Sequence, residues 1–317
     1  MTTEQREDPF EDPFEDPSEE RIEDRTEDPL IEHRRLLFGT AYRMLGSVAD
    51  AEDILQDAWL KWAEADRSQV RNPRAYLVRT VTNLALNRLA SAQVRREAYV
   101  GPWLPEPLLT APDTAAERAE LDESVSLAML VVLETLSPLE RAVFVLREVF
   151  GYSNAELAQT LEKSEAAVRQ LAHRAKAHVQ ERQPRYETDP GERRAVTERF
   201  LAACATGEAS RVMELLAPGV VSWSDGGGVV RAALRPVRGA DKVARWALGV
   251  LAKPEMAGAT AEFAWVNGEE ALLFRTAEGS VLAAVAYAVR DGLIQEMWTQ
   301  LNPAKLSGLA AGEPYPV

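Results

Sequence analysis

The chain of 317 residues has very little of the two residue types that most often build covalent or metal-bound frameworks, with one cysteine, Cys204, and three histidines. A single cysteine excludes an internal disulfide framework and is typical of a reducing, cytoplasmic environment. Long apolar runs are also missing. The run that comes nearest to membrane-spanning length, 281–289, is much too short to cross a membrane. The amino terminus is acidic where a secretory signal would be basic, and no motif calls for a metal or another cofactor. We therefore expect a cytoplasmic protein without a membrane partner.

Positive charge is scarce, since 36 Lys and Arg face 50 Asp and Glu, for a formal net charge of −14. Residues 1–29 hold 13 of these acids against 3 bases, a balance of −10, so the remaining chain carries only −4. This segment contains the repeat EDPFEDPFEDPSEE, which is too charged and too often interrupted by proline to order itself. It predicts a disordered acidic tail. The alternative is that the tail mimics nucleic acid and competes with it for the basic surfaces of this chain.

The length exceeds what one typical core supports, so two or three domains are expected. Helical periodicity is interrupted by a proline-rich segment at 99–114, and it gives way after about residue 190 to a mixture of helix and strand patterns with hairpin signals such as Asn267-Gly268 and Asp291-Gly292. The predicted organisation is a disordered tail (1–29), an all-α domain (30–98), a linker (99–123), a second all-α domain (124–183), a short linker (184–190), an α+β domain (191–302) and a C-terminal tail (303–317).

The second helical block reads as a helix-turn-helix. Capping boxes at 137–140 and 153–156 mark two helix starts, and a turn at 162–164 separates a short helix from a longer amphipathic one. The polar side of the longer helix can enter a major groove, because Ala166 permits close approach and neighbouring side chains can meet base edges and phosphates. These side chains are Arg169, Gln170, His173 and Arg174. An ordinary solvated helix face is the alternative.

The first helical block combines an acidic helix with a basic one. Residues 50–62 place Asp50, Asp53 and Asp57 in a stripe beside an apolar side that includes Trp59 and Trp62, while residues 71–96 hold six arginines and no acid. The polar side of the basic helix is suited to unpaired bases, because amides read base edges, arginines hold phosphates and an aromatic ring can stack. Its members are Tyr76, Arg79, Asn83 and Asn87.

This combination resembles an extracytoplasmic-function sigma factor. The segments LLFGTAYRMLGSVADAEDILQDAWLKW and NPRAYLVRTVTNLALNRL are similar to sigma domain 2, and residues 124–183 are similar to sigma domain 4. The resemblance implies that Asp50, Asp53, Gln56, Asp57 and Trp59 dock on the clamp helices of the largest subunit of core RNA polymerase. It implies contacts with promoter DNA at two elements. Tyr76, Arg79, Asn83 and Asn87 would hold the minus-ten element, where a flipped base helps to open the duplex, and Arg169, Gln170, His173 and Arg174 would read the minus-thirty-five element.

Residues 191–302 resemble the SnoaL-like, ketosteroid-isomerase-type cone, in which a curled sheet wraps a helix around an apolar pocket. One subgroup of these sigma factors carries this domain together with the motifs WLPEP, D-G-G-G-K and N-P-D-K-L. The present chain has Val229 and Ala304 where the last two motifs have lysine and aspartate. The resemblance implies that the cone regulates the sigma domains by packing on the linker and domain 2. The implied regulatory contacts are Trp103, Leu104, Pro105, Asp225, Gly226, Gly227, Gly228, Asn302, Pro303, Lys305 and Leu306.

The cone could instead be an enzyme, because isomerases of this fold need only a pocket acid or base. All three histidines precede the domain, so a His–Asp pair inside it is excluded, and Asp225, Asp241 and Glu262 are the lone carboxylates that could serve. Asp225 adjoins a triple glycine and is more simply explained by a turn or by contact with the linker. We therefore expect a transcription initiation factor that consumes no substrate, with a small-molecule ligand of the cone as a further candidate partner. A DNA-binding regulator that ignores polymerase and a cone-fold isomerase or hydrolase tethered to DNA are the alternatives.

Overall fold

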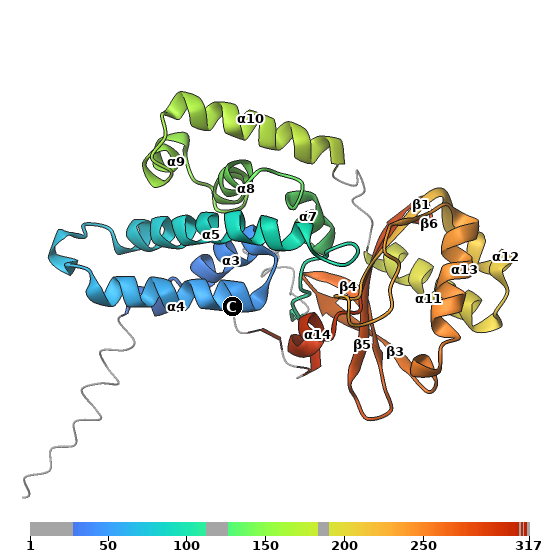
Figure 1. Ribbon diagram of the computed structural model, residues 1–317. Helices are drawn as coiled ribbons and strands as arrows, with labels where there is room; N and C mark the ends of the chain where they lie inside the picture. Colours follow the sequence, from blue (N-terminus) through green and yellow to red (C-terminus); the bar gives the residue numbers. More distant parts are fainter. Residues whose placement is uncertain (1–27, 112–125, 183–189, 311, 313, 316–317) are drawn as a thin grey trace, which may run out of the picture.

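The computed structural model describes residues 28–111, 126–182, 190–310, 312, 314 and 315, without the side chains of 92–97. The helices of residues 29–182 form one body, and an α+β domain lies beside that body (Figure 1). The predicted multidomain class, with two all-α regions followed by an α+β domain, is confirmed. Nearly all of the predicted acidic tail, part of the first linker and nearly all of the second lie outside the described residues.

The first helical region contains α2 (Pro29–Glu32), α3 (Arg34–Leu45), α4 (Val48–Glu64), the 3-10 turn η1 (Arg67–Gln69) and α5 (Pro73–Glu97). Gly46 ends α3 in the left-handed conformation (φ 67°), and the Ser47 hydroxyl caps α4 by accepting from the Asp50 amide. The expected apolar side of α4 is buried except at Trp59, which is 49% exposed, whereas Trp62 is 3% exposed. One residue of the expected core therefore remains available on the surface.

The second helical region contains α7 (Leu127–Leu133), α8 (Pro138–Phe144), a π-helical turn η2 (Val145–Val149), α9 (Asn154–Thr160) and α10 (Glu165–Arg182). Both predicted capping boxes form, at Ser137 with Glu140 and at Ser153 with Glu156. Glu162 takes a positive φ of 52° between α9 and α10, and α10 buries the predicted apolar stripe. The helix-turn-helix prediction is confirmed.

The two helical regions share one apolar core. Helix α8 packs on α5 and α3, so that α5 lies between α4 on one side and α8 and α9 on the other (Figure 1). Arg141 of α8 is 2% exposed and donates a hydrogen bond of 2.7 Å to the Met44 carbonyl at the end of α3. Burial lowers the pKa of this guanidinium, which also forms an ion pair of 2.6 Å with Glu134.

The α+β domain is a six-stranded sheet with strand order β2-β1-β6-β5-β4-β3. Its elements are α11 (Pro190–Thr206), α12 (Ala209–Met213), β1 (Leu216–Asp225), β2 (Val237–Arg238), α13 (Ala240–Leu251), η3 (Pro254–Met256), β3 (Thr260–Val266), β4 (Glu269–Arg275), β5 (Val281–Arg290), β6 (Leu293–Gln300) and α14 (Pro303–Ala310). The Asn267-Gly268 and Asp291-Gly292 turns have positive φ at both residues and close the hairpins β3–β4 and β5–β6, as predicted.

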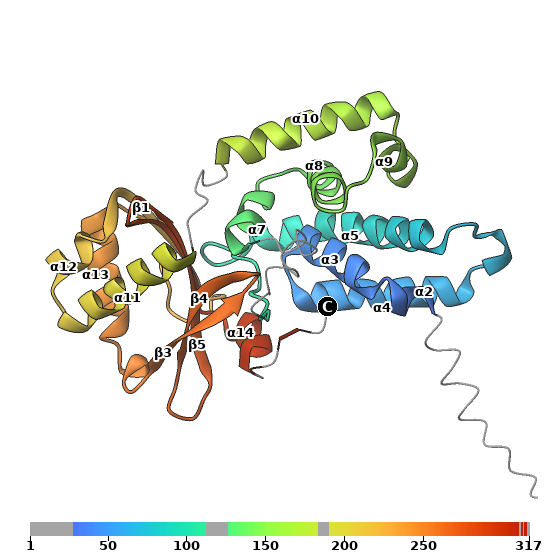
Figure 2. The same cartoon turned by 180° about the vertical axis from the view of Figure 1, so that it is seen from behind.

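The sheet separates two apolar layers. Helices α11, α12 and α13 lie on one face, as seen from behind in Figure 2, and enclose the core of the cone. The other face meets the linker, α14 and α7, and Trp298 on this face belongs to the apolar core of the helical body. The α+β domain is therefore joined to the helical body through one face of its sheet.

Two segments that were predicted as a linker and a C-terminal tail are packed against the rest of the protein. Residues 104–109 of the linker are buried, because they lie between the helical body and the sheet and form a β-bridge between Leu109 and Val266. The segment after Asn302 begins with α14, whose Leu306 and Leu309 are buried against the sheet. The described part of the linker is thus a packed strand-like segment, which proline content alone does not reveal. No helix within the described ranges is long and apolar enough to cross a membrane.

Candidate functional site

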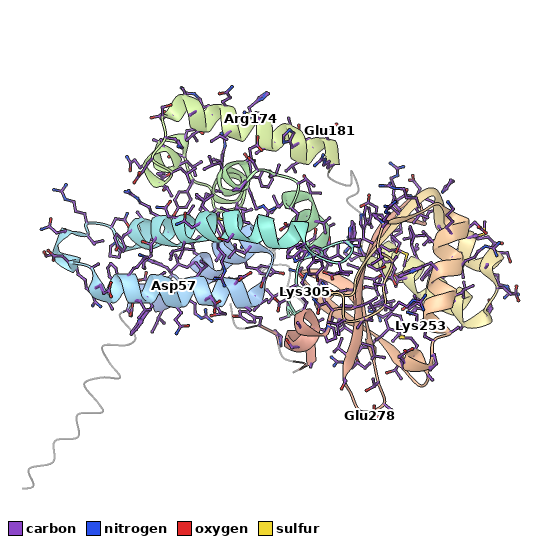
Figure 3. The ribbon with its side chains drawn as sticks, in the orientation of Figure 1. Asp57, Arg174, Glu181, Lys253, Glu278 and Lys305 are labelled. Atoms are coloured by element: carbon purple, nitrogen blue, oxygen red, sulfur yellow. The ribbon has the colours of Figure 1, made fainter. Side chains whose placement is uncertain are left out.

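Two carboxylates of the acidic stripe on α4 form ion pairs with an arginine of α5. Arg88 of α5 contacts Asp50 at 2.6 Å and Asp53 at 2.7 Å, which raises the pKa of its guanidinium, chiefly through the hydrogen bond to Asp50. Gln56 and Asp57 are exposed further along the same helix, beside Trp59. Figure 3 labels Asp57 on α4. The predicted polymerase contacts therefore share one helix, and two of the three carboxylates in its acidic stripe are held by an arginine of the basic helix.

The polar side of α5 faces the turn of the helix-turn-helix. Asn83 and Asn87 are exposed, and the exposed Arg79 forms an ion pair with Glu162, the positive-φ residue between α9 and α10. Tyr76 is half-buried, with its ring centroid 5.6 Å from that of Trp62. The structure brings the four predicted minus-ten residues onto one side of α5 and places the second helical region against one of them.

A hollow beside Tyr76 was missed by the sequence reasoning. It has a volume of about 490 Å³ and is lined by the segment between α4 and α5, including Asp66, Gln69, Arg71 and Asn72. Asp66 is held by hydrogen bonds from Ser68, which lower the pKa of its carboxyl. These residues are amide, carboxylate and guanidinium groups, the types that meet base edges and phosphates. The only available signal was the high polar content of the segment before the basic helix.

The outer face of α10 carries all four predicted minus-thirty-five residues, and all four are exposed. Arg169 is paired with Glu165 one turn earlier at 3.4 Å. Arg174, labelled in Figure 3, contacts Glu140 of α8 at 3.2 Å, and the capping-box hydrogen bonds of Ser137 help to hold the pKa of that carboxyl low despite its burial. Arg174 is consequently tied to its own domain, while Arg169 is paired only within its exposed helix face.

The predicted regulatory residues converge on Asp225, which has no exposed surface. Its carboxylate accepts from the Tyr99 hydroxyl at 2.7 Å, from the Leu104 amide at 2.9 Å and from Lys305 Nζ at 2.7 Å. The ammonium of Lys305 also lies 4.0 Å from the centroid of the Trp103 ring. One carboxylate at the end of β1 thus joins the linker to the start of α14.

The triple glycine and Asn302 complete this junction. Gly227 has a φ of 63°, and a Cβ there would lie 2.5 Å from the Asn302 side chain, so only glycine permits the approach. Asn302 donates to the Tyr99 hydroxyl at 3.1 Å, and its side-chain oxygen accepts from the Ala304 amide at the start of α14. Pro303 is the first residue of that helix, and Gln300 donates to the Leu104 and Pro105 carbonyls at 3.4 and 3.3 Å.

A second junction was not predicted. The Tyr42 hydroxyl of α3 donates to the Glu106 carbonyl and accepts from the Asn267 amide, each at 2.7 Å. The Glu106 carboxylate accepts from the Val48 amide at 2.8 Å, although burial raises its pKa. Asn267 also accepts from the Leu108 amide at 3.1 Å. The linker glutamate of WLPEP therefore caps α4, and a residue that the sequence indicated only as a hairpin turn contacts the first helical region.

The carboxylates that could have served an enzyme are engaged elsewhere. Asp225 lies on the linker side of the sheet, Asp241 is exposed and paired with Arg245, and the exposed Glu262 is paired with Arg275. None of the described residues that line the apolar hollow inside the cone is charged. The described lining of the hollow therefore offers no carboxylate or imidazole for proton transfer.

Comparison with known proteins agrees with these features. Residues 30–95 match the profile of Sigma-70 region 2, and residues 126–179 match that of Sigma-70, region 4. The chain is 40% identical over 286 residues to the ECF RNA polymerase sigma factor SigJ of Mycobacterium tuberculosis, which covers 87% of this chain and 91% of SigJ. The crystal structure of SigJ superposes with a TM-score of 0.68 and 38% identity, over 87% of this chain and 96% of that one. ECF sigma factor SigG of the same species is 31% identical over 211 residues, or 58% of this chain and 56% of SigG.

Proposed function

This chain belongs to the ECF RNA polymerase sigma factors, and from that premise we propose which surfaces bind polymerase and promoter and how the cone controls them. It is a transcription initiation factor rather than an enzyme, with core RNA polymerase and promoter DNA as its partners. The observation that carries the assignment of surfaces is the separation of exposed charge: an acidic, aromatic face on α4 and basic, amide-rich faces on α5 and α10.

The polymerase contact is the exposed surface of α4, which carries Asp53, Gln56, Asp57 and Trp59, with Gln56 one turn before Trp59. A large exposed aromatic ring on a helix that also exposes carboxylate and amide groups has the composition of a binding hot spot, because the ring supplies apolar area and the polar groups supply orientation. Arg88 already neutralises part of the acidic stripe, so Asp57 is the acid best placed to meet a basic partner surface.

The promoter contacts are the polar side of α5 with the hollow next to Tyr76, and the outer face of α10. An extruded base needs a pocket with hydrogen-bonding groups and an aromatic neighbour, and the hollow of about 490 Å³ provides both. On α10, Arg169 and Gln170 have their side chains exposed over a helix that projects at the edge of the body (Figure 1). Two separate contacts on one chain gain affinity through effective concentration.

The arrangement described above is a closed state. Arg79 cannot hold a phosphate while it is paired with Glu162, and the two helical regions share a core that fixes their spacing. The cone stabilises this state by holding the linker through Asp225, Lys305 and Asn267. Polymerase and promoter would bind more tightly to an open state, in which the second helical region leaves α5, than to the closed state. Their binding would therefore shift the chain toward the open state.

Size-exclusion chromatography of the full chain with core RNA polymerase tests the proposed α4 surface. We expect a one-to-one complex with the wild type, and loss of that complex with the double variant Asp57→Arg, Trp59→Ala. The variant Asp241→Arg makes the same charge change on the cone and should leave the complex intact. Failure of the wild-type chain to bind polymerase, in the presence of a promoter that it recognises, would support a DNA-binding regulator that acts without polymerase.

A further inference from the structure

Exposed apolar side chains gather where the linker meets the cone. Half of the large apolar side chains that are exposed among the described residues lie here, each between 37% and 77% exposed. They are Val100 of the linker and Val229, Val230 and Leu234 of the loop between β1 and β2, and together they form the apolar patch. A Cβ at Gly228 would lie 3.3 Å from Val100, and one at Gly101 would lie 3.6 Å from Leu234, so the two segments lie against each other. Clustered apolar groups of this kind mark interaction sites, whereas scattered ones are ordinary.

The loop that carries most of the apolar patch is basic. Residues 226–240 contain three arginines and no acid. Arg231 and Arg235 are exposed, and neither forms an ion pair with a described residue. Lys253, labelled in Figure 3, donates from Nζ to the Arg231 carbonyl at 3.1 Å and brings a further positive charge to the loop. An occupant of the apolar patch therefore needs apolar side chains set among acidic ones.

The predicted acidic tail of the same chain has this composition. Residues 7–17, EDPFEDPFEDP, hold six acids, no base and two phenylalanines, Phe10 and Phe14. The rings can cover exposed valine and leucine side chains, and the carboxylates can meet unpaired arginines. Because the tail is tethered, its effective concentration at a surface within reach is on the order of millimolar, so weak contacts hold it more readily than they would hold a separate protein or an anionic membrane.

The point of attachment brings the apolar patch within reach of the tail. From Asp28, α2 and α3 lead to Gly46, where a Cβ would lie 2.7 Å from the ring of Trp103, and Trp103 follows Val100 closely in the linker. This path is at most about 50 Å long, from the rise of a helix and of an extended chain. The chain from Phe10 to Asp28 can span about 60 Å when extended. Phe10 can therefore reach the apolar patch without any change in the described fold.

The outer face of α10 and the polar side of α5 are the other basic surfaces that could hold an acidic segment. No large apolar side chain is exposed on α10 or among the described side chains of α5. Both surfaces can pair with acids, but they offer no apolar contact to the two rings. The repeated placing of a phenylalanine after acids thus favours the apolar patch over nucleic-acid mimicry.

We propose that residues 7–17 of the tail bind the apolar patch of their own chain, with Phe10 and Phe14 on its valine and leucine side chains and the acids beside Arg231 and Arg235. The apolar patch belongs in part to the linker and in part to the cone, so a bound tail adds contacts between the two. This consequence rests on the proposed function, in which the cone restrains the linker in the closed state. The tail strengthens that restraint, and removal of its rings shifts the chain toward the open state.

Photocrosslinking of the full chain tests where the tail binds. Phe10 is replaced by p-benzoylphenylalanine, which keeps an aromatic ring and on irradiation bonds to C–H groups in contact with it, and the crosslinked peptides are identified by mass spectrometry. We expect crosslinks within one chain to residues 99–101 or 228–235. Crosslinks that map to α5 or α10 would overturn the site in favour of nucleic-acid mimicry. Crosslinks between two chains, or none that recur, would overturn it as well.

A matched pair of substitutions tests the apolar part of the contact. Leu234→Glu adds a charge at a position that is 68% exposed, so the fold should be retained while the crosslink yield falls about threefold or more. Met213→Glu makes the same change at an exposed position of α12 and should leave the yield as in the wild type. Equal yields for the two variants would contradict the apolar patch as the site.

The dependence of the crosslink on salt tests the charged part of the contact. At an ionic strength of about 1 M the Debye length is only about 3 Å, so attraction between the acids of the tail and the exposed arginines is screened. We expect the crosslink yield to fall at this ionic strength. A yield that does not depend on salt would contradict the pairing of the tail with Arg231 and Arg235.

Hydrogen exchange of the linker tests the restraint. Phe10→Ala with Phe14→Ala keeps every charge of the tail and removes both rings, and we expect the Leu104 amide, which donates to Asp225, to exchange faster by about threefold or more. Ile22→Ala removes an apolar side chain outside the repeat and should exchange as the wild type does. Unchanged exchange of Leu104 in the double variant would overturn the restraint. Neither measurement contains polymerase or promoter, so failure here is distinct from failure of the proposed polymerase and promoter contacts.

Discussion

At Asp225, a carboxylate without exposed surface is satisfied by donors from the linker and from α14. Burial of a charge is unfavourable unless hydrogen bonds and an opposite charge replace its hydration. Lys305 supplies the opposite charge, and Tyr99 and Leu104 supply hydrogen bonds. The lysine that pairs with Asp225 is Lys305 of the N-P-D-K-L motif, whereas Val229, which stands at the lysine position of the D-G-G-G-K motif, is 77% exposed.

Replacing Asp225 with asparagine should destabilise the junction by about 3–5 kcal/mol, because Lys305, whose side chain is only 12% exposed, loses its counterion. Denaturant unfolding of the full chain, followed at the cone, measures this loss. The control Asp241→Asn removes an exposed ion pair with Arg245 and should cost less than about 1 kcal/mol. Addition of Lys305→Met to Asp225→Asn should recover part of the loss, and a double variant as unstable as the single one would contradict the pairing.

Glu296 gives the cone a dependence on pH. Burial raises the pKa of its carboxyl from 4.5 to about 7, while Arg238 acts in the opposite direction. The folded state therefore binds the proton of Glu296 more tightly than the unfolded state, so protonation of this carboxyl stabilises the fold. The stabilisation is complete below pH 4.5 and is lost as the pH rises from 4.5 to about 7. We expect wild-type stability to fall relative to Glu296→Gln by at most about 2 kcal/mol over that range, after allowance for partial solvent exposure. Parallel pH profiles of the two proteins would contradict it.

At the scale of elements, α5 and α10 show what the sequence predicts well. Apolar periodicity predicts both helices and assigns the exposed side of each. What the sequence does not show is the partner of each exposed group. Glu162 lies 83 residues from Arg79, and Asn267 lies 225 residues from Tyr42, so both contacts depend on tertiary packing that no local pattern encodes.

Glu162→Gln should release Arg79 for the promoter. An exposed ion pair contributes at most about 1 kcal/mol, so we expect promoter affinity of the holoenzyme to rise about two- to fivefold. Glu278→Gln makes the same charge change in the β4–β5 turn, at the far end of the cone in Figure 3, and should have no effect. Equal affinities for Glu162→Gln and the wild type would show that the pair does not restrain Arg79.

Arg169→Ala tests the outer face of α10. Loss of a phosphate contact should weaken promoter binding similarly for all sequences and reduce the slope of log affinity against log salt by about 1, whereas loss of a base contact should relax specificity at one position. Arg211→Ala on α12 of the cone is the matched loss of charge and should leave binding unchanged. Arg174→Ala should also weaken binding, with an added loss of stability because the carboxylate of Glu140 loses its ion pair with Arg174.

At the scale of the whole molecule, the linker is the shared component of the two parts. It caps α4 through Glu106, is bound by Asp225 from the cone and pairs with β3 at Leu109. The sequence predicted a linker from the interruption of helical periodicity, but the three prolines in its described part also leave few amides that need partners, so this segment can be buried in extended form. This is the largest difference between the expectation and the structure.

Cutting the chain after Asn302 should open the closed state. The cut removes Lys305, the buried Leu306 and Leu309 of α14, and Tyr315, whose ring lies 4.6 Å from that of Phe38 in α3. We expect increased protease sensitivity of the linker and altered transcription, with the two helical regions still folded by circular dichroism. The full-length variant Gly308→Ala, at an exposed position of α14 with no atom close to the new methyl group, should behave as the wild type. Unchanged linker sensitivity after the cut would argue against control by this segment.

The central claim, that this chain directs core RNA polymerase to promoters, is tested most directly by in vitro transcription. Core enzyme and the full chain are incubated with a genomic promoter library, and the 5′ ends of the transcripts are mapped. We expect discrete start sites that share a minus-ten and a minus-thirty-five element and that disappear with Asp57→Arg, Trp59→Ala. Transcripts that start at the same positions without the chain would contradict a role in promoter recognition. So would the absence of any transcript with both the full chain and its truncation after Asn302.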